Sequence, residues 1–177
     1  MNVLINKQKP NKMTVVNIIL LITATLTGLS AGLLYAYACS VNLGLGRLPD
    51  REYLSAMQSI NKEILNPLFF AGFFGALILL FVSAYLNYSH PASSRFIFLL
   101  IAALIYTIGV FGVTSFGNVP LNDGLAKVNL QSSSLAEISK LRISFEVPWN
   151  RLHSIRTIAS VISLVLVILA CLKVDTR

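Results

Sequence analysis

Residues 96–116 read FIFLLIAALIYTIGVFGVTSF, a run without one charged side chain. An α-helix of about 20 apolar residues is long enough to cross the roughly 30 Å of hydrocarbon in a bilayer. The run lacks the polar–apolar alternation that a membrane β-strand would show. We therefore predict a membrane-spanning helix here, and this prediction sets the fold class of the chain.

Three further apolar runs, at about 15–38, 65–86 and 155–172, have the same character. The chain of 177 residues is 55% hydrophobic and 12% charged, about half the charged fraction of an ordinary soluble domain. No polar block is large enough to form a second core. The sequence therefore predicts an all-α protein, with one antiparallel four-helix membrane domain over residues 14–177 and a disordered tail at 1–13.

The connection between the first two spans carries an amphipathic pattern. Its apolar side chains recur at the three- to four-residue spacing of a helix face and are Tyr53, Leu54, Met57, Ile60 and Ile64. This spacing predicts a helix that lies on the bundle or in the membrane interface. Asn66-Pro67 is expected to end it and to start the second span, because Pro suits the first turn of a helix.

The connection between the last two spans carries a second such pattern. Ser134 and Glu137 form a capping-box signal, and apolar residues follow at Leu135, Ile138, Leu141 and Phe145. We expect a second amphipathic helix that Pro148 ends. Both amphipathic helices then lie on the same side of the membrane.

The charge pattern bears on partners and orientation. The formal net charge is +7, and the basic residues gather at the ends of the spans, where lipid headgroups are the natural counterions. We therefore expect the lipid bilayer, and no nucleic acid, as a partner. Lys7, Lys9 and Lys12 precede the first span and favour cytoplasmic termini in a plasma or inner membrane, with the long connections outside.

Small and aromatic residues in the first two spans suggest packing and a pocket. Gly28 and Gly32 lie four apart, and small residues at that spacing let helices approach closely in lipid. The second span contains an aromatic cluster that either lines a pocket for a planar ligand or faces core and lipid, namely Phe69, Phe70, Phe73 and Phe74.

Most of the chemically active side chains lie where the third span ends and the fourth begins. Trp149, His153 and Arg156 are spaced four and three apart, so they share one helix face, and Ser160 continues it. Arg151 points elsewhere. A histidine and an arginine at the mouth of a membrane helix need partners or water.

The expected partners are Asn118, Asn122 and Asp123, which the topology places on the same side. Asp123 either pairs with Arg156 or fixes the tautomer of His153. Pro120 is expected to unwind the end of the third span, and such irregular backbone is tolerated where it lines a cavity. The two clusters together predict a polar pocket.

Each of these residues also has a structural explanation. In this explanation, Arg151 and Arg156 would anchor helices at headgroups and His153 would cap a loop. Trp149 would belong to an interfacial aromatic belt. No zinc spacing, phosphate-binding loop or dinucleotide fingerprint occurs in the sequence. We therefore expect no metal and no cofactor.

The paired motifs resemble those of the anthrone-oxygenase-like family of small membrane proteins. They are Asn118-Val-Pro-Leu-Asn122-Asp123 and Trp149-x-Arg151-x-His153-x-x-Arg156-Thr157. The first half of the chain is also similar to the family, at Gly28 to Tyr35, Met57-Gln58-x-Ile60-Asn61 and Asn66-Pro67. The resemblance covers most of the chain and is more specific for the family than for an activity.

The resemblance implies oxidation of an anthrone to an anthraquinone by O2 without metal or flavin. His153 would be the base, Arg156 a cationic donor to the oxyanion and Asp123 the orienter. The substrate-binding residues implied in addition are Asn118, Asn122, Trp149, Arg151, Gln58 and Asn61.

Two functions from different classes remain open on the sequence. The first is a cofactor-independent oxygenase acting on a lipophilic, aromatic small molecule. The second is a non-catalytic membrane protein that binds a small amphiphile or a protein partner, a copy of itself included. A transporter is the third candidate. It ranks below the other two because four spans without an internal repeat do not fit the usual transporter architecture.

Overall fold

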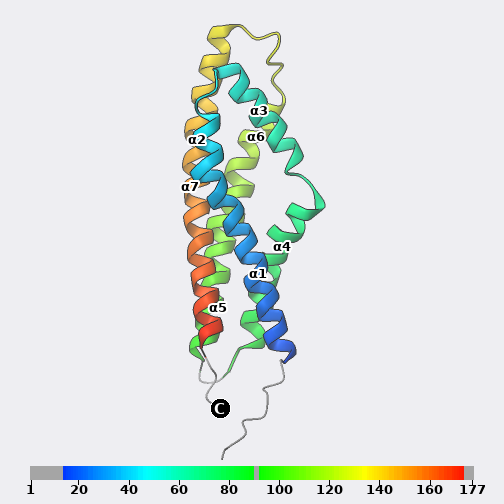
Figure 1. Cartoon of the computed structure of the whole chain (residues 1–177), viewed down its shortest axis with the longest axis vertical. Helices are drawn as coiled ribbons and strands as arrows, with labels where there is room; N and C mark the ends of the chain where they lie inside the picture. Colours follow the sequence, from blue (N-terminus) through cyan, green and yellow to red (C-terminus); the bar gives the residue numbers. More distant parts are fainter. Residues whose placement is uncertain (1–13, 90–91, 174–177) are drawn as a thin grey trace, which may run out of the picture.

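The computed structural model describes residues 14–89 and 92–173 of the chain, and the predicted tail at 1–13 lies outside this range. The described chain is all-helical and passes four times along one bundle (Figure 1). All four passes are long and apolar enough to cross a membrane. The predicted four-helix membrane bundle is confirmed, and the protein is a multi-pass membrane protein.

The first pass runs from Val15 to Leu45. It consists of α1 (Val15–Ala36), a π-helical segment η1 (Tyr37–Val41) and the short α2 (Asn42–Leu45). Thr14 caps its start, since its side-chain oxygen accepts a hydrogen bond from the backbone N–H of Asn17.

The second pass is the shortest. Helix α3 (Asp50–Glu63) precedes it and α4 (Pro67–Leu86) forms it. Asn66 caps α4 through its side-chain oxygen and Pro67 fills the first turn, as the Asn66-Pro67 pair predicts. At about 1.5 Å per residue, the 20 residues of α4 span roughly 30 Å, the thickness of the hydrocarbon layer.

The third pass is longer than the predicted span 96–116 and runs from Ser94 to Ala126. It consists of α5 (Ser94–Ile105), two π-helical segments η2 (Tyr106–Gly112) and η3 (Thr114–Asn118), and α6 (Val119–Ala126). Pro120 does not unwind the span end, because it lies in the first turn of α6. The widened π turn just before it accommodates the proline ring and the missing N–H.

The fourth pass is one continuous helix, α7 (Leu135–Leu172). The capping box at Ser134 and Glu137 is confirmed. Pro148 lies inside the helix, so the prediction that it separates an amphipathic helix from the fourth span is wrong. One lost backbone hydrogen bond is outweighed here because Phe145 and Trp149 on either side of the proline are both buried in the same core.

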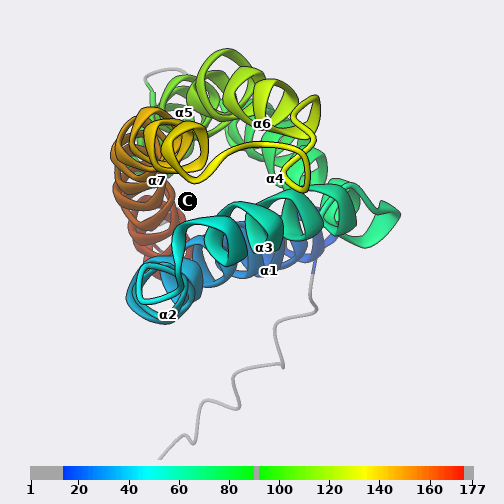
Figure 2. The ribbon, with the colours of Figure 1, turned by 90° about the horizontal axis from the view of Figure 1, so that it is seen from above.

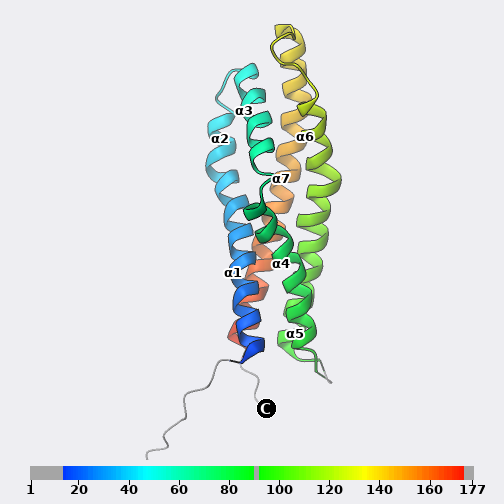
Figure 3. The same cartoon turned by 90° about the vertical axis from the view of Figure 1, so that its right-hand side faces the viewer.

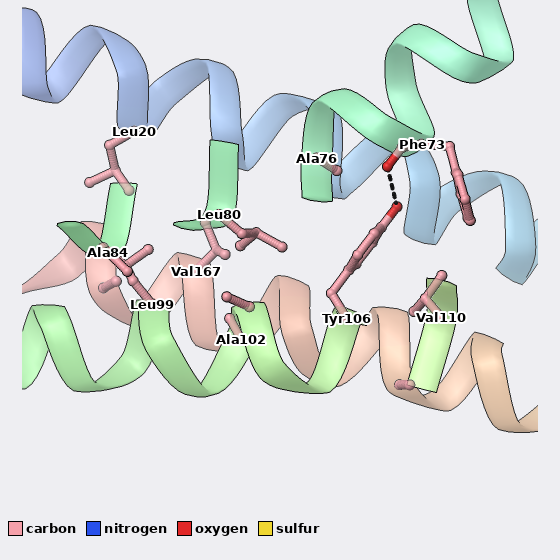
Figure 4. Packing of buried hydrophobic residues seen from close by; sticks show 13 residues of the cluster. Leu20, Phe73, Ala76, Leu80, Ala84, Leu99, Ala102, Tyr106, Val110 and Val167 are labelled. Carbon is pink, nitrogen blue, oxygen red and sulfur yellow. Dashed lines mark hydrogen bonds between the residues drawn. The ribbon is translucent and has the colours of Figure 1, made fainter. Parts of the chain in front are cut away.

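Two apolar cores fill the bundle. The lower core lies between α1, α4, α5 and α7, and Figure 4 shows its residues, with Leu80, Leu99 and Ala102 fully buried. The hydroxyl of Tyr106 donates to the backbone carbonyl of Phe73 at 3.2 Å, which ties the third pass to α4 (Figure 4). A buried polar pair, Thr23 and Ser83, joins α1 to α4 at 2.7 Å.

The upper core lies beneath α3. Tyr53, Leu54 and Met57 of α3 pack with side chains from α6 and α7, so this amphipathic helix lies on the bundle. Figures 2 and 3 show α3 beside the bundle at the end opposite the α4–α5 turn, and from there it runs back toward α4. We call this end the α3 end.

One arginine fixes the start of α3 to α7. Arg142 donates to Asp50 at 3.0 Å, to Glu146 at 2.8 Å and to the backbone carbonyls of Gly46 and Leu48. Its guanidinium lies 4.5 Å from the centre of the Tyr53 ring. Burial raises the pKa of the Tyr53 hydroxyl, so this ring stays neutral beneath the cation.

The close helix approach is not at the predicted glycines. Gly32 has open space where a side chain would start, and Gly28 is only in ordinary contact distance of Leu164. A Cβ at Gly109, in η2, would lie 2.5 Å from the Cβ of Ala159 in α7. The backbone of the third pass at Gly109 therefore lies directly against the methyl group of Ala159 in the fourth pass.

Candidate functional site

A cavity of about 480 Å³ lies at the α3 end, bounded by all four passes and α3. Its lining comes from α1 and η1, from α3 with the link to α4, from the start of α4, and from η3, α6 and α7. Its apolar lining includes Leu33, Leu34, Ile60, Ile64, Leu65 and Phe69. Its polar lining includes Asn61, Asn118, Asn122, His153 and Arg156.

Stacked groups on α7 form one part of the lining. The rings of Trp149 and His153 lie 5.1 Å apart at an interplanar angle of 12°. The guanidinium carbon of Arg156 lies 5.1 Å from the centre of the Trp149 ring. The predicted shared face is confirmed, and Trp149 and His153 are almost completely buried, at 3% and 1% exposure.

The contacts of His153 determine its tautomer. Nε and Nη2 of Arg156 lie 3.2 Å and 3.0 Å from Nδ1 of His153. A guanidinium only donates, so Nδ1 accepts and the ring proton sits on Nε2. The Thr157 hydroxyl donates to the backbone carbonyl of His153 at 2.8 Å, which leaves its oxygen, 3.4 Å from Nε2, free to accept. His153 is therefore a neutral imidazole with its basic nitrogen against Arg156.

Arg156 has no carboxylate partner among residues 14–89 and 92–173. Asp123 lines the mouth of the cavity and is exposed, but it forms no ion pair with Arg156 and no hydrogen bond with His153. The expected roles of Asp123, pairing with Arg156 or fixing the His153 tautomer, are not seen. Arg156 itself fixes the imidazole, and its charge faces the cavity without compensation.

The two asparagines of the third pass hold Trp149 in place. The indole Nε1–H donates to Oδ1 of Asn122 at 2.8 Å. The amide of Asn118 donates through Nδ2 to the backbone carbonyl of Trp149 at 3.3 Å. Two side chains one helical turn apart thus position one residue of the facing helix.

Unpartnered polar atoms remain in the lining. Oδ1 of Asn118 and Nδ2 of Asn61 are buried and have no hydrogen-bond partner within the described chain. Most buried polar groups in proteins are paired, so a lining with one free acceptor and one free donor is suited to a polar ligand.

The remaining predicted binding residues differ in position. Gln58 lines the cavity, but its amide nitrogen donates to the carbonyls of Leu125 and Val128 and so ties α3 to α6. Arg151 is exposed and is not part of the lining. Of the phenylalanine cluster, Phe69 lines the cavity, while Phe73 belongs to the lower core.

Sequence reasoning missed two lining residues. Tyr37 stacks obliquely on His153 with ring centres 5.2 Å apart, and its hydroxyl donates to the sulfur of Met57 at 3.3 Å. Thr114 accepts from Nη1 of Arg156 at 3.5 Å. Tyr37 is one helical turn from Leu33 and Leu34, so the lining face of the first pass is visible in its spacing once the cavity is known.

The missed residues share a backbone feature. Tyr37 begins η1, and Thr114 and Asn118 begin and end η3. A π turn is wider than an α turn and turns the residues of a helix toward a new direction, and such turns are frequent at functional sites. Hydrophobic periodicity carries no signal for a π turn.

Comparison with known proteins identifies a protein family. The family model described as anthrone oxygenase matches residues 68–166, more than half of the chain. This range contains Asn118, Asn122, Trp149, His153 and Arg156, but neither Tyr37 nor α3. No curated protein and no solved structure matches the chain.

Proposed function

Because the chain belongs to the anthrone oxygenase family, we propose that it is a cofactor-independent oxygenase that acts on a lipophilic aromatic substrate in this cavity. The observation that carries the proposal is the lining itself. An imidazole, an uncompensated guanidinium and the amides of Asn118 and Asn122 converge on one cavity with an indole ring. These are the groups that proton abstraction and oxyanion binding need.

The reaction requires no external electron donor. A base removes one hydrogen of the anthrone CH2 as a proton, and the anion that remains is delocalised onto the ring oxygen. The carbanion carbon reacts with O2 to form a hydroperoxide. Loss of water then leaves a carbonyl, so one oxygen atom stays on carbon and the other departs with the two CH2 hydrogens.

His153 and Arg156 supply complementary parts of this chemistry. Nδ1 of His153 is the basic nitrogen, and it accepts from Arg156. An oxyanion is a better acceptor for a guanidinium than a neutral imidazole is. The substrate oxygen gains negative charge as the CH2 proton leaves, so the guanidinium passes from Nδ1 to this oxygen while Nδ1 takes the proton.

Turnover of anthrone in air tests the proposal. Purified protein in detergent is mixed with anthrone, and anthraquinone absorbance and O2 uptake are followed against a protein-free sample, since anthrone oxidises slowly by itself. We expect His153→Ala to lower the rate roughly 100- to 10,000-fold, the usual contribution of general base catalysis. We expect Arg156→Gln to lower it as well, because the oxyanion loses its cationic donor.

Arg47→Gln is the matched control, because Arg47 is exposed and outside the lining. It should turn over anthrone like the wild type. If His153→Ala keeps the wild-type rate, the assignment of the base is wrong.

The contact between Arg156 and Nδ1 also favours a second candidate, a non-catalytic protein that binds an amphiphile. In that case the cation serves to bind an acidic or carbonyl headgroup, and the imidazole only positions the cation. Ligand binding without any acceleration of anthrone oxidation would support this function over the oxygenase.

A further inference from the structure

The strongest unexplained feature of the cavity is the carbonyl oxygen of the Asn118 side chain. Asn118 is 1% exposed and belongs to the lining, and its Oδ1 has no partner within the described chain. The orientation of its amide is fixed. Nδ2 faces the carbonyl of Trp149 at 3.3 Å, and a flipped amide would place two oxygens together there.

No donor within the described chain forms a hydrogen bond to this oxygen, the unpartnered Nδ2 of Asn61 included. Arg156 donates to His153 and Thr114, and the Trp149 N–H donates to Asn122. A buried acceptor without a donor loses its hydrogen bonds to water on folding and gains none in return, which destabilises the folded protein. The oxygen is therefore suited to a donor that arrives with a ligand.

We propose that Oδ1 of Asn118 accepts a hydrogen bond from a hydroxyl group on the aromatic ketone that binds in this cavity. The ketone oxygen faces Arg156, a step that rests on the oxyanion role given to Arg156 in the proposed function. The hydroxyl is not the reacting group. Asn118 is thus a specificity-determining residue that distinguishes hydroxyl from ether or hydrogen.

The rest of the cavity fits the body of such a ligand. Phe69, Leu65 and Leu33 add apolar surface to the same lining that holds the polar groups. An aromatic frame with polar atoms along one edge finds both apolar contacts and hydrogen-bonding groups in such a lining.

Two simple aryl ketones, 4-hydroxybenzophenone and 4-methoxybenzophenone, test the hydrogen bond to Oδ1 of Asn118 separately from the other contacts. Both carry the same ketone, and they differ only in whether the second oxygen donates. Trp149 is the only tryptophan in the chain and lines the cavity, so quenching of its fluorescence reports occupancy directly. Titrations are made in detergent below the pKa of the phenol, and each probe's partition into micelles is measured without protein.

We expect wild-type protein to bind the phenol roughly 10- to 100-fold more tightly than the ether after correction for partition, as sites built to pair a buried polar group do. In Asn118→Leu this preference should vanish while both probes still bind. Asn17→Leu is the matched control. Asn17 is exposed at the opposite end of α1, and this variant should keep the full preference.

Equal affinities of wild-type protein for the phenol and the ether overturn the proposal, and this comparison needs no variant that has to fold. A preference that survives in Asn118→Leu overturns the role of Asn118. Neither probe has an oxidisable CH2 group, so the result is independent of catalysis. A clear preference together with no anthrone turnover leaves this inference standing and removes the oxygenase. Anthrone turnover without a preference for the phenol supports the oxygenase and overturns the role of Asn118.

Discussion

The indole of Trp149 shows how single residues in the site depend on the facing helix. It is 3% exposed, and its N–H donates to Asn122 at 2.8 Å. The same ring carries the guanidinium of Arg156 and stacks on His153. A change at Asn122 therefore reaches the imidazole through the indole, without any direct contact between Asn122 and His153.

Asn122→Leu should leave the Trp149 N–H buried without an acceptor. We expect a loss of about 1–3 kcal/mol in the free energy of unfolding. The fluorescence maximum of the protein should also move to shorter wavelength, since the indole loses its polar partner. Asn122→Asp keeps an oxygen at that position and should keep the wild-type emission. An unchanged spectrum in Asn122→Leu would show that the hydrogen bond does not form in solution.

At this scale the spacing of Trp149, His153 and Arg156 was sufficient to predict a common face, because helix geometry alone determines it. The partner of Arg156 could not be predicted. The sequence offers Asp123 as the opposite charge, but α6 places that side chain at the exposed mouth of the cavity. The guanidinium instead turns to the imidazole one turn earlier on its own helix.

At the scale of elements, the apolar runs and the caps predicted the passes well. Asn66-Pro67 and the Ser134 capping box both lie at helix starts. Pro120 and Pro148 did not behave as predicted, because tertiary packing outweighs a single lost hydrogen bond. Pro148 stays inside α7 since the flanking side chains are buried together, and Pro120 follows a π turn. Neither influence is visible in local sequence.

The contact between η2 and α7 gives a test of helix packing. In Gly109→Ala the new methyl group would meet Ala159 at 2.5 Å, so the two helices must separate. We expect a loss of about 1–3 kcal/mol in the free energy of unfolding, the usual cost of overpacking, measured by circular dichroism in detergent. Gly72→Ala is the control, because open space surrounds Gly72.

The double variant Gly109→Ala/Ala159→Gly restores the space and should recover much of the lost stability, which a double-mutant cycle measures. Full additivity of the two single effects would show that these two residues do not touch.

Arg142 gives a second test, at the junction of α3 and α7. Arg142→Met removes donors to Asp50, Glu146 and two backbone carbonyls at once. We expect the free energy of unfolding to fall by about 2–3 kcal/mol, since hydrogen bonds to charged groups are the stronger ones. Backbone amides near the start of α3 should exchange hydrogen faster. Lys140→Met, at an exposed position of the same helix, should change neither quantity.

The whole molecule combines one short pass with three long ones. Helix α4 has the length of the hydrocarbon layer, whereas the other passes have 31 to 38 residues and continue beyond it at the α3 end (Figure 3). The space above α4 is closed by α3 and its link instead, and the cavity lies there. We propose that α4 spans the hydrocarbon layer and that the site lies at its boundary with the headgroups, where an amphiphile dissolved in the membrane has its polar end.

The orientation of the bundle is tested with its two native cysteines. Both are exposed, with Cys39 in η1 at the α3 end and Cys171 in the last turn of α7 at the other end. We propose that the termini are cytoplasmic, because three lysines precede the first span.

In intact cells, a membrane-impermeant maleimide should then label Cys171→Ser, which keeps Cys39. It should label Cys39→Ser only after lysis. Labelling of both variants in detergent confirms that each thiol reacts. The reverse order in intact cells would place the α3 end and its cavity in the cytoplasm, and substrates would then have to come from inside the cell.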